Sequence, residues 1–218
     1  MKQFFCKYKH ILPFLIYFPI YIVWFVLLEK NVTEYTLIHS VLDDHIPFIE
    51  VFVIPYYMWF GYVVVSILIA FFTDVPEYYR TAKFLISGMT IFLVISTFWP
   101  TGLDLRPVVM PRENIFTTLC QKLYSTDTAT NVLPSIHVFN SIGCNLCINR
   151  CSYTKNKRWI CNLSSVICTL IILSTMFIKQ HSVIDVATAL IMALVLYIVF
   201  YFDEVRAFFE LKRSAFVK

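Results

Sequence analysis

Residues 171–202 read IILSTMFIKQHSVIDVATALIMALVLYIVFYF, and this stretch decides the fold. Two apolar runs are separated by the short polar segment 179–182. The first run, taken with the apolar residues before it, reaches the roughly 17 to 25 residues that cross about 30 Å of hydrocarbon as a helix, and the second run reaches this length by itself. The stretch therefore predicts two membrane-spanning helices, near 159–178 and 182–202, joined by a tight polar turn.

The rest of the chain has the composition of a membrane protein. Of its 218 residues, 59% are hydrophobic and 15% are charged, whereas the apolar share of a soluble globule is about half. Four further apolar segments lie near 11–29, 50–72, 83–100 and 133–149. These runs are continuous rather than alternating, which favours helices over a β-barrel. We predict an all-α, polytopic membrane protein, a six-transmembrane-helix bundle in which residues 1–218 form a single domain.

Lysine and arginine are distributed unevenly between the two sides of this predicted bundle. With a cytoplasmic N-terminus, the inner set of 13 is Lys2, Lys7, Lys9, Arg80, Lys83, Arg150, Lys155, Lys157, Arg158, Arg206, Lys212, Arg213 and Lys218. The outer set of 5 is Lys30, Arg106, Arg112, Lys122 and Lys179. This positive-inside excess predicts that both termini are cytoplasmic. Topology and attraction to anionic lipid then account for the net charge of +4, and no nucleic-acid partner is implied.

Five polar residues fall at the predicted outer ends of the apolar segments or in the outer loop between them. They are Arg106, Ser135, His137, His181 and Asp185. Ionisable groups near lipid are costly and tend to mark functional sites. Because the topology brings three segments distant in sequence to one membrane face, we interpret these residues as one site.

Each of these residues has a chemical role and an ordinary alternative. Asp185 lies one helical turn after His181 and can orient its imidazole as a nucleophile, although such a pair can also simply cap a helix. Ser135 follows Pro134 at a predicted helix start. The free N–H groups there can bind an anion, but Pro and Ser also favour this position in helices that bind nothing. The planar guanidinium of Arg106 can bind two phosphate oxygens at once, or it can be an interfacial anchor among lipid headgroups. His137 lies one turn into the same helix as Ser135 and is a candidate general acid.

The order and spacing of these residues resemble the type-2 phosphatidic acid phosphatase superfamily. The family motifs are Lys-x6-Arg-Pro, Pro-Ser-Gly-His and Ser-Arg-x5-His-x3-Asp. The matching segments here are Arg106-Pro107, Pro134-Ser135-Ile136-His137, and Ser174-Thr175 followed by His181 and Asp185. The likeness covers about 80 residues, the core motifs 106–185, together with the six-helix layout.

Three positions depart from the family pattern. Trp99 stands where the family has Lys, Ile136 where it has Gly, and Thr175 where it has Arg. In this respect the chain is most similar to the branch of inositol phosphorylceramide synthases, where Pro-Ser-x-His-Val and Lys-Gln-His-x3-Asp occur. Two phosphate-binding cations are missing, and Lys179, Arg112 or Lys122 are candidates to replace them.

The resemblance implies a metal-independent phosphoryl transfer on the extracytoplasmic face. His181 would be the nucleophile, Asp185 its orienting group, and His137 the general acid and base; Arg106, Ser135 and Lys179 would bind phosphate. We expect a lipid phosphatase that acts on a phosphomonoester or pyrophosphate, such as phosphatidate or a polyprenyl pyrophosphate. The alternatives are a phosphotransferase of the inositol phosphorylceramide synthase type and a non-catalytic binder of anionic lipid. The sequence leaves open which lipid is used and whether hydrolysis or transfer follows.

No cofactor, metal ion or obligate protein partner is implied. Cys144, Cys147 and Cys151 share a helical face, but zinc normally takes four ligands, so we interpret them as small packing residues or acylation sites. Asp127, in the outer loop, is at most a weak cation ligand together with Asp104.

Overall fold

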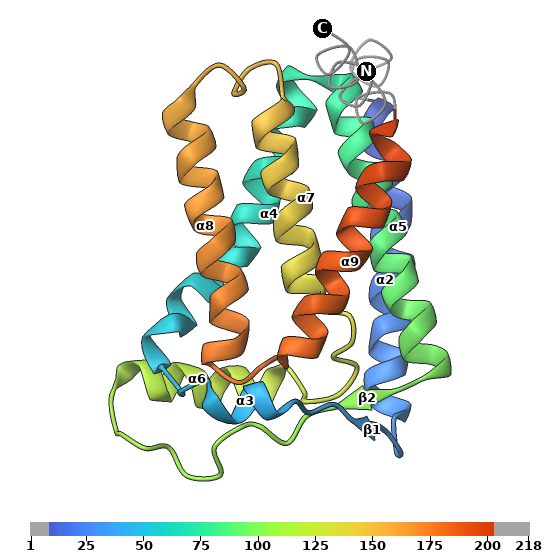
Figure 1. Ribbon diagram of the computed structural model, residues 1–218. Helices are drawn as coiled ribbons and strands as arrows, with labels where there is room; N and C mark the ends of the chain where they lie inside the picture. The colour runs from blue at the N-terminus through green and yellow to red at the C-terminus, as the bar shows by residue number, and fades with distance from the viewer. Residues whose placement is uncertain (1–8, 203–218) are drawn as a thin grey trace, which may run out of the picture.

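The computed structural model describes residues 9–202 as a bundle of long helices with most of the short elements gathered at one end (Figure 1). The long helices are α2 (Leu12–Asn31), α4 (Val53–Thr73), α5 (Val75–Phe98), α7 (Ile136–Arg150), α8 (Arg158–Phe177) and α9 (Val183–Phe200). The short elements are η1 (Lys9–Ile11), β1 (Thr36–Leu37), α3 (Val41–His45), η2 (Glu50–Phe52), β2 (Thr101–Gly102) and α6 (Ile115–Thr126). The two strands form a small parallel pair.

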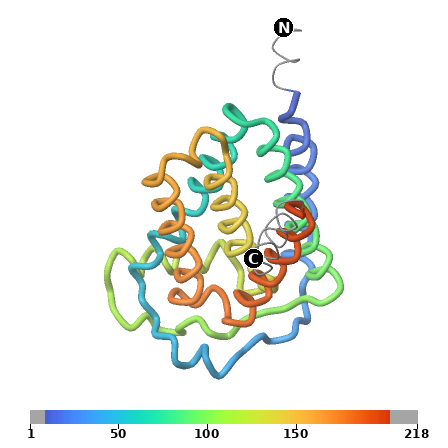
Figure 2. Tube along the Cα trace, turned by 45° about the horizontal axis from the view of Figure 1, so that its top comes forward, coloured from blue at the N-terminus to red at the C-terminus, as the bar shows by residue number. Residues whose placement is uncertain are grey.

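Five of the long helices, all except α7, are long and apolar enough to cross a membrane. The all-helical membrane protein expected from the sequence is therefore present, but the predicted sixth span is not among these five. Helix α7 has 15 residues, which rise about 22 Å, less than the roughly 30 Å of a hydrocarbon core. It is the central helix, in contact with α4, α5, α8 and α9 (Figure 2), so its surface is covered mainly by protein.

Helix α5 begins at Val75 rather than near residue 83, where the sequence analysis placed its start. Asp74 caps it by accepting a hydrogen bond from the Glu77 backbone N–H at 3.1 Å. The first turns carry Glu77 and Arg80, and these charges interrupt the apolar run from which the prediction was made. Asp74 also accepts the Ser152 N–H at 2.8 Å, which joins the α4–α5 turn to the loop between α7 and α8.

The first half of α7 is packed closely against α5 at Gly88. A Cβ atom on Gly88 would lie 2.1 Å from the Phe139 ring, so only glycine allows this approach. The Phe139 ring stacks on Phe84 with centroids 4.7 Å apart, and both side chains are buried. This contact fixes the position of α7 just after His137.

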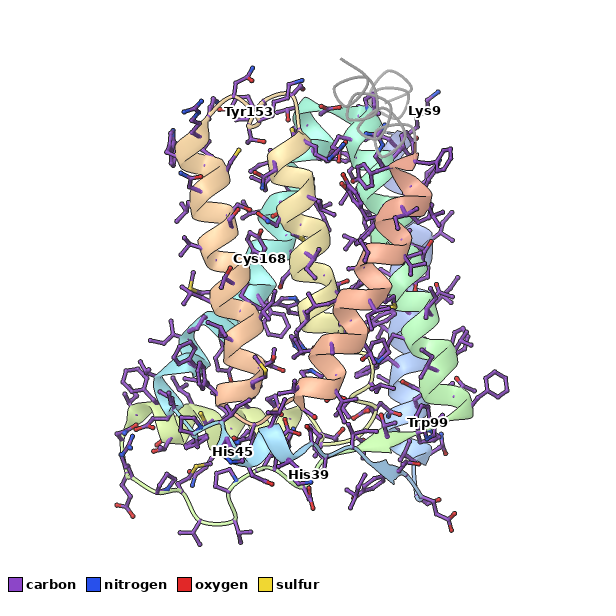
Figure 3. The ribbon with its side chains drawn as sticks, viewed as in Figure 1. Lys9, His39, His45, Trp99, Tyr153 and Cys168 are labelled. Atoms are coloured by element: carbon purple, nitrogen blue, oxygen red, sulfur yellow. The ribbon has the colours of Figure 1, made fainter. Side chains whose placement is uncertain are left out.

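The two ends of the bundle differ in structure. The loop end, made of residues 32–52, 99–135 and 178–182, holds α3, α6 and both strands, and His39, His45 and Trp99 mark it in Figure 3. Of residues 9–202, the opposite end holds η1, the turn at Asp74 and the loop 151–157, and Lys9 and Tyr153 lie there. The predicted cytoplasmic placement of the termini concerns residues 1–8 and 203–218, which lie outside the described residues.

Candidate active site

His181 lies in the tight turn between α8 and α9. The N–H groups of Gln180 and His181 both donate to the Thr175 carbonyl, at 2.9 and 3.0 Å, and so close the end of α8. Lys179 adopts a positive φ of 55°, which lets the chain reverse direction there. Ser182 then begins α9 as its N-cap and accepts the Ile184 N–H at 3.1 Å. The turn therefore presents His181 from a position fixed on both sides.

The imidazole of His181 is paired with Asp185. Its Nδ1 lies 3.3 Å from Oδ2 of Asp185, and the two residues are 7% and 0% exposed. The same carboxylate oxygen accepts the Ser182 N–H at 2.9 Å, so Asp185 both caps α9 and holds the ring. With Nδ1 directed at the carboxylate, Nε2 is the ring nitrogen left for chemistry.

His137 faces His181 from the first turn of α7. The two ring centroids are 5.7 Å apart. The ring of His137 packs between Tyr56 and Trp59, with centroid distances of 4.6 and 4.5 Å. Its Nδ1 is buried without a hydrogen-bond partner. Aromatic packing thus fixes this imidazole while leaving that nitrogen unpaired.

Both histidines line one small cavity. Its volume of about 30 Å³ holds about two or three waters, since each needs roughly 10 to 15 Å³. Its walls are Phe25, Phe92, Asp127, Thr128, Thr130, Asn131, Val132, Ile136, His137, Gln180 and His181. Further buried polar atoms without a partner belong to this region: Nε of Arg106, Oδ1 of Asp185 and Oδ1 of Asn131. Buried polar atoms are usually paired, so this concentration fits a ligand site.

The three predicted segments meet behind this cavity. Ser135 is fully buried and its backbone N–H donates to the Asp185 carbonyl at 3.2 Å. Its hydroxyl caps α7 by accepting the Val138 N–H at 3.4 Å. Arg106 donates through Nη2 to the Gln180 side-chain oxygen, next to His181. The site residues predicted at the core of the motifs are therefore neighbours in space.

Arg106 is engaged mainly with protein oxygens. Its Nη2 donates to the carbonyls of Asp127 and Thr128 at 2.8 and 2.9 Å, and Nη1 to that of Tyr124 at 3.3 Å. The guanidinium also stacks over the Tyr124 ring at 4.6 Å. Burial lowers the pKa of Arg106 from its ordinary value. In this arrangement Arg106 ties the outer loop to Gln180, and Nε is its buried N–H without a partner.

Lys179, a candidate to replace a missing phosphate-binding cation, is bonded away from the cavity in this structure. Its ammonium donates to the carbonyls of Asp43 and Ile46 at 2.7 and 2.6 Å, and it is not among the cavity-lining residues. Burial lowers the pKa of Lys179 from its ordinary value. Arg112 is likewise engaged elsewhere, since its Nη1 pairs with the Glu50 carboxylate at 2.9 Å. Neither residue supplies the missing charge in this structure.

Sequence reasoning missed Asp43 and considered Asp127 only as a weak cation ligand. Asp127 lines the cavity and accepts the Tyr56 hydroxyl at 2.6 Å and the Gln180 amide at 3.4 Å. Asp43 lies on the other side of the turn and binds the start of α9. The Ser-x-x-Asp sequence from residue 40 to 43 signals a local helix cap. It carries no signal that the carboxylate also reaches a helix far along the chain.

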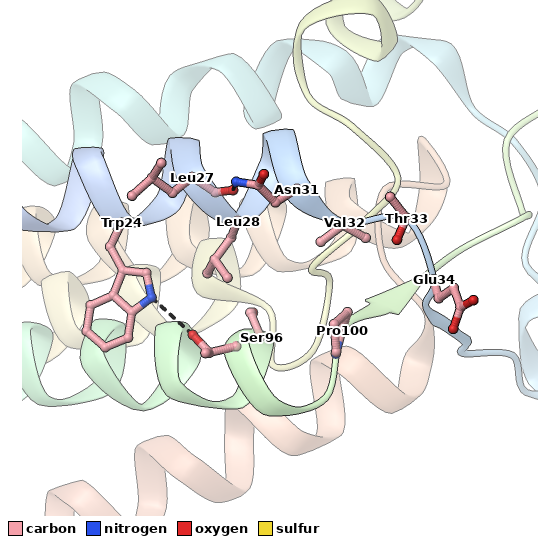
Figure 4. Close-up of a pocket in the computed structure, with 10 residues that line it drawn as sticks. Trp24, Leu27, Leu28, Asn31, Val32, Thr33, Glu34, Ser96 and Pro100 are labelled. Carbon is pink, nitrogen blue, oxygen red and sulfur yellow. Dashed lines mark hydrogen bonds between the residues drawn. The ribbon is translucent and has the colours of Figure 1, made fainter.

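A wider hollow of about 460 Å³ lies between α2 and α5 near the loop end (Figure 4). Trp24, Leu27 and Leu28 line it from α2, and Ser96 lines it from α5. Trp24 closes one wall by donating to Thr97 at 3.0 Å. Neither His137 nor His181 lines this hollow. We therefore place the candidate site at the smaller cavity, which both imidazoles line.

Among residues 9–202 no group of three or more His, Cys, Asp or Glu side chains is placed to hold a metal ion. Cys144, Cys147 and Cys151 are buried and unbridged. No protein-family model, no curated protein and no solved structure matches the chain.

Proposed function

We propose that this chain is a membrane enzyme that cleaves a phosphate ester or anhydride of a lipid through a covalent intermediate on His181. The observation that carries the proposal is the pair of imidazoles on one cavity, with ring centroids 5.7 Å apart and His181 paired with Asp185. A nucleophile with an orienting carboxylate and a second proton-transfer group is the arrangement that nucleophilic catalysis requires. The resemblance to the type-2 phosphatidic acid phosphatases supports the same chemistry.

The proposed reaction has two steps. Nε2 of His181 attacks phosphorus, the bond from phosphorus to the lipid alkoxide breaks, and His137 gives its proton to that alkoxide. Water then attacks the phosphohistidine, His137 takes the water proton, and phosphate leaves His181. Asp185 stabilises the charged imidazole, and phosphoryl oxygens bind at the N-terminus of α7 after Ser135, where Ile136 and His137 line the cavity. Arg106 holds Gln180 beside them. Positioning and electrostatic stabilisation supply most of the rate.

The proposed membrane arrangement follows the charge distribution along the sequence. The loop end faces away from the cytoplasm, α7 completes a six-helix layout, and both termini are cytoplasmic. The cavity then lies at the outer membrane–water boundary, where a lipid headgroup reaches it. No cofactor or protein partner is part of the proposal.

A second candidate is transfer of the phosphoryl-containing headgroup to an alcohol, and Asp127 favours it. The cavity lining includes this carboxylate and no Lys or Arg. A phosphomonoester carries a charge of about −1.5 to −2 at neutral pH. A phosphodiester carries a single charge and is repelled less by Asp127. Such a substrate is used by the inositol phosphorylceramide synthases that the sequence resembles.

A lipid panel tests these candidates with purified protein in detergent and a chelator present. Wild type and His181→Ala are given short-chain phosphatidate, a polyprenyl pyrophosphate, and phosphatidylinositol with or without ceramide. Phosphate release that His181→Ala abolishes supports hydrolysis. Headgroup transfer that requires ceramide supports the second candidate. If wild type turns over no lipid from mildly acidic to mildly alkaline pH, the enzyme proposal fails and the non-catalytic binder of anionic lipid is favoured.

A further inference from the structure

The segment of residues 38–49, here called the strap, passes beneath the turn between α8 and α9, and α3 is its helical part (Figure 1). Ser40 begins α3 with a reciprocal capping box to Asp43. Asp43 is 2% exposed, although its neighbour Asp44 has a side chain that is 59% exposed. A buried carboxylate is costly unless it is well hydrogen-bonded, so its partners indicate its role.

The carboxylate of Asp43 binds the first residues of α9. Oδ2 accepts the Ser182 hydroxyl at 2.6 Å and the Ser40 N–H at 2.8 Å. Oδ1 accepts the Val183 N–H at 2.8 Å. These contacts supply a negative charge and an acceptor to the N-terminus of α9, where N–H groups lack partners within the helix.

The strap also binds the other side of the turn. The Lys179 ammonium donates to the Asp43 and Ile46 carbonyls at 2.7 and 2.6 Å. Lys179 has a φ of 55°, and a non-glycine residue keeps that conformation only when its surroundings fix it. Lys179 and Ser182 flank Gln180 and His181 in the sequence, so the strap fixes both ends of the segment that presents the imidazole.

We propose that Asp43 is a positioning residue that sets the ring of His181 for attack on phosphorus, an inference that rests on the function proposed above. Asp43 holds Ser182, whose N–H donates at 2.9 Å to the Asp185 oxygen that also pairs with His181. A displacement of Ser182 therefore displaces the acceptor that orients the imidazole. Asp43 does not line the cavity, so it acts on the geometry of attack and not on substrate binding.

The first test compares Asp43→Asn with Asp44→Asn. Both substitutions remove one negative charge from α3, but the Asp44 side chain bonds the exposed His39 rather than α9. We expect Asp43→Asn to lower kcat by about 10- to 100-fold and to leave KM within about twofold, because misplacing a reacting group slows chemistry more than binding. Asp44→Asn should keep both constants. Equal kcat values for the two variants, or an effect confined to KM or to the melting temperature, would overturn the proposal.

A second variant covers the case in which Asp43→Asn does not fold. Ser182→Ala removes the hydroxyl that joins Asp43 to α9 and should also lower kcat at nearly constant KM. Where both single variants fold, kcat of the double variant should be no lower than that of the worse single variant, because both substitutions remove the same contact between Asp43 and Ser182. A Ser182→Ala protein with wild-type kcat, or single losses that multiply in the double variant, would contradict this path.

A readout independent of turnover separates this proposal from the proposed function. The rate at which diethyl pyrocarbonate modifies His181, followed by peptide mass spectrometry, reports the orientation and access of the imidazole. We expect the rate to change severalfold in Asp43→Asn and to stay at the wild-type value in Asp44→Asn. If wild type is inactive on every lipid, the enzyme proposal fails while this measurement still decides the positioning. An unchanged rate in Asp43→Asn would overturn it.

Discussion

The two histidines of the candidate site are held by different means. The His181 turn is fixed by hydrogen bonds, to Asp185 directly and to Asp43 through Ser182. The His137 region is fixed by packing, with Tyr56 and Trp59 against the ring and its Nδ1 left unpaired. An attacking imidazole needs one nitrogen directed by an acceptor, whereas a group that gives and takes a proton needs a fixed ring with a nitrogen that no protein group occupies. The difference thus matches the roles proposed for the two residues.

The largest expected effect comes from removing the imidazole of His181, which hydrogen bonds hold in place. His181→Ala should lower turnover by at least about 1,000-fold, because the nucleophile is lost while the rest of the cavity stays. The measurement is kcat on whichever lipid the panel identifies. His45→Ala is the control, since this exposed histidine on α3 bonds the nearby Val41 carbonyl and should keep wild-type turnover. Residual activity of His181→Ala within tenfold of wild type would show that His181 is not the nucleophile.

Asp185→Asn weakens the same half of the site without removing the ring. We expect kcat to fall by about 100-fold or more, because the amide can still cap α9 but no longer stabilises the charged imidazole or fixes its tautomer. The melting temperature should fall little, since the amide oxygen of asparagine can still accept the Ser182 N–H. A large loss of stability with unchanged kcat per folded molecule would assign Asp185 to capping alone.

The packed half of the site is tested at Gly88. Gly88→Ala places a methyl group against Phe139 and should destabilise the protein by about 1 to 3 kcal/mol, the usual range for overpacking. Gly61→Ala is the matched control, because nothing lies within 4 Å of its added Cβ. It should be neutral or stabilising by up to about 1 kcal/mol, since alanine favours the helix. Melting temperatures of the two variants decide the comparison, and equal values would contradict the close approach of α5 and α7.

The smallest effect is expected from Tyr56→Phe. The substitution removes the 2.6 Å hydrogen bond to Asp127 but keeps the ring against His137. The loss of one such bond corresponds to about 1 kcal/mol, or roughly fivefold in kcat/KM. Tyr56→Leu removes the aromatic ring as well and should cost clearly more. Equal values of kcat/KM for the two variants would show that ring packing does not orient His137.

The sequence predicted local features and missed contacts between distant segments. The pairing of His181 with Asp185 follows from four-residue helical spacing, and the structure contains it. The start of α7 was predicted three residues too early, because the apolar run includes Leu133 and Pro134 whereas the helix begins after its cap, Ser135. The contacts of Lys179 were not predicted, since nothing in its neighbourhood along the chain shows that the strap lies beside it. Asp43 was missed for the same reason, although its local capping pattern is plain.

The most direct test of the account is the site of phosphorylation during turnover. Wild type is mixed with the active lipid and quenched in alkali, which preserves phosphohistidine, and peptides are sequenced by mass spectrometry and the ring position assigned by NMR. We expect phosphate on Nε2 of His181, because Nδ1 is directed at Asp185. Phosphate on His137, or an active enzyme in which no histidine becomes phosphorylated, would contradict it.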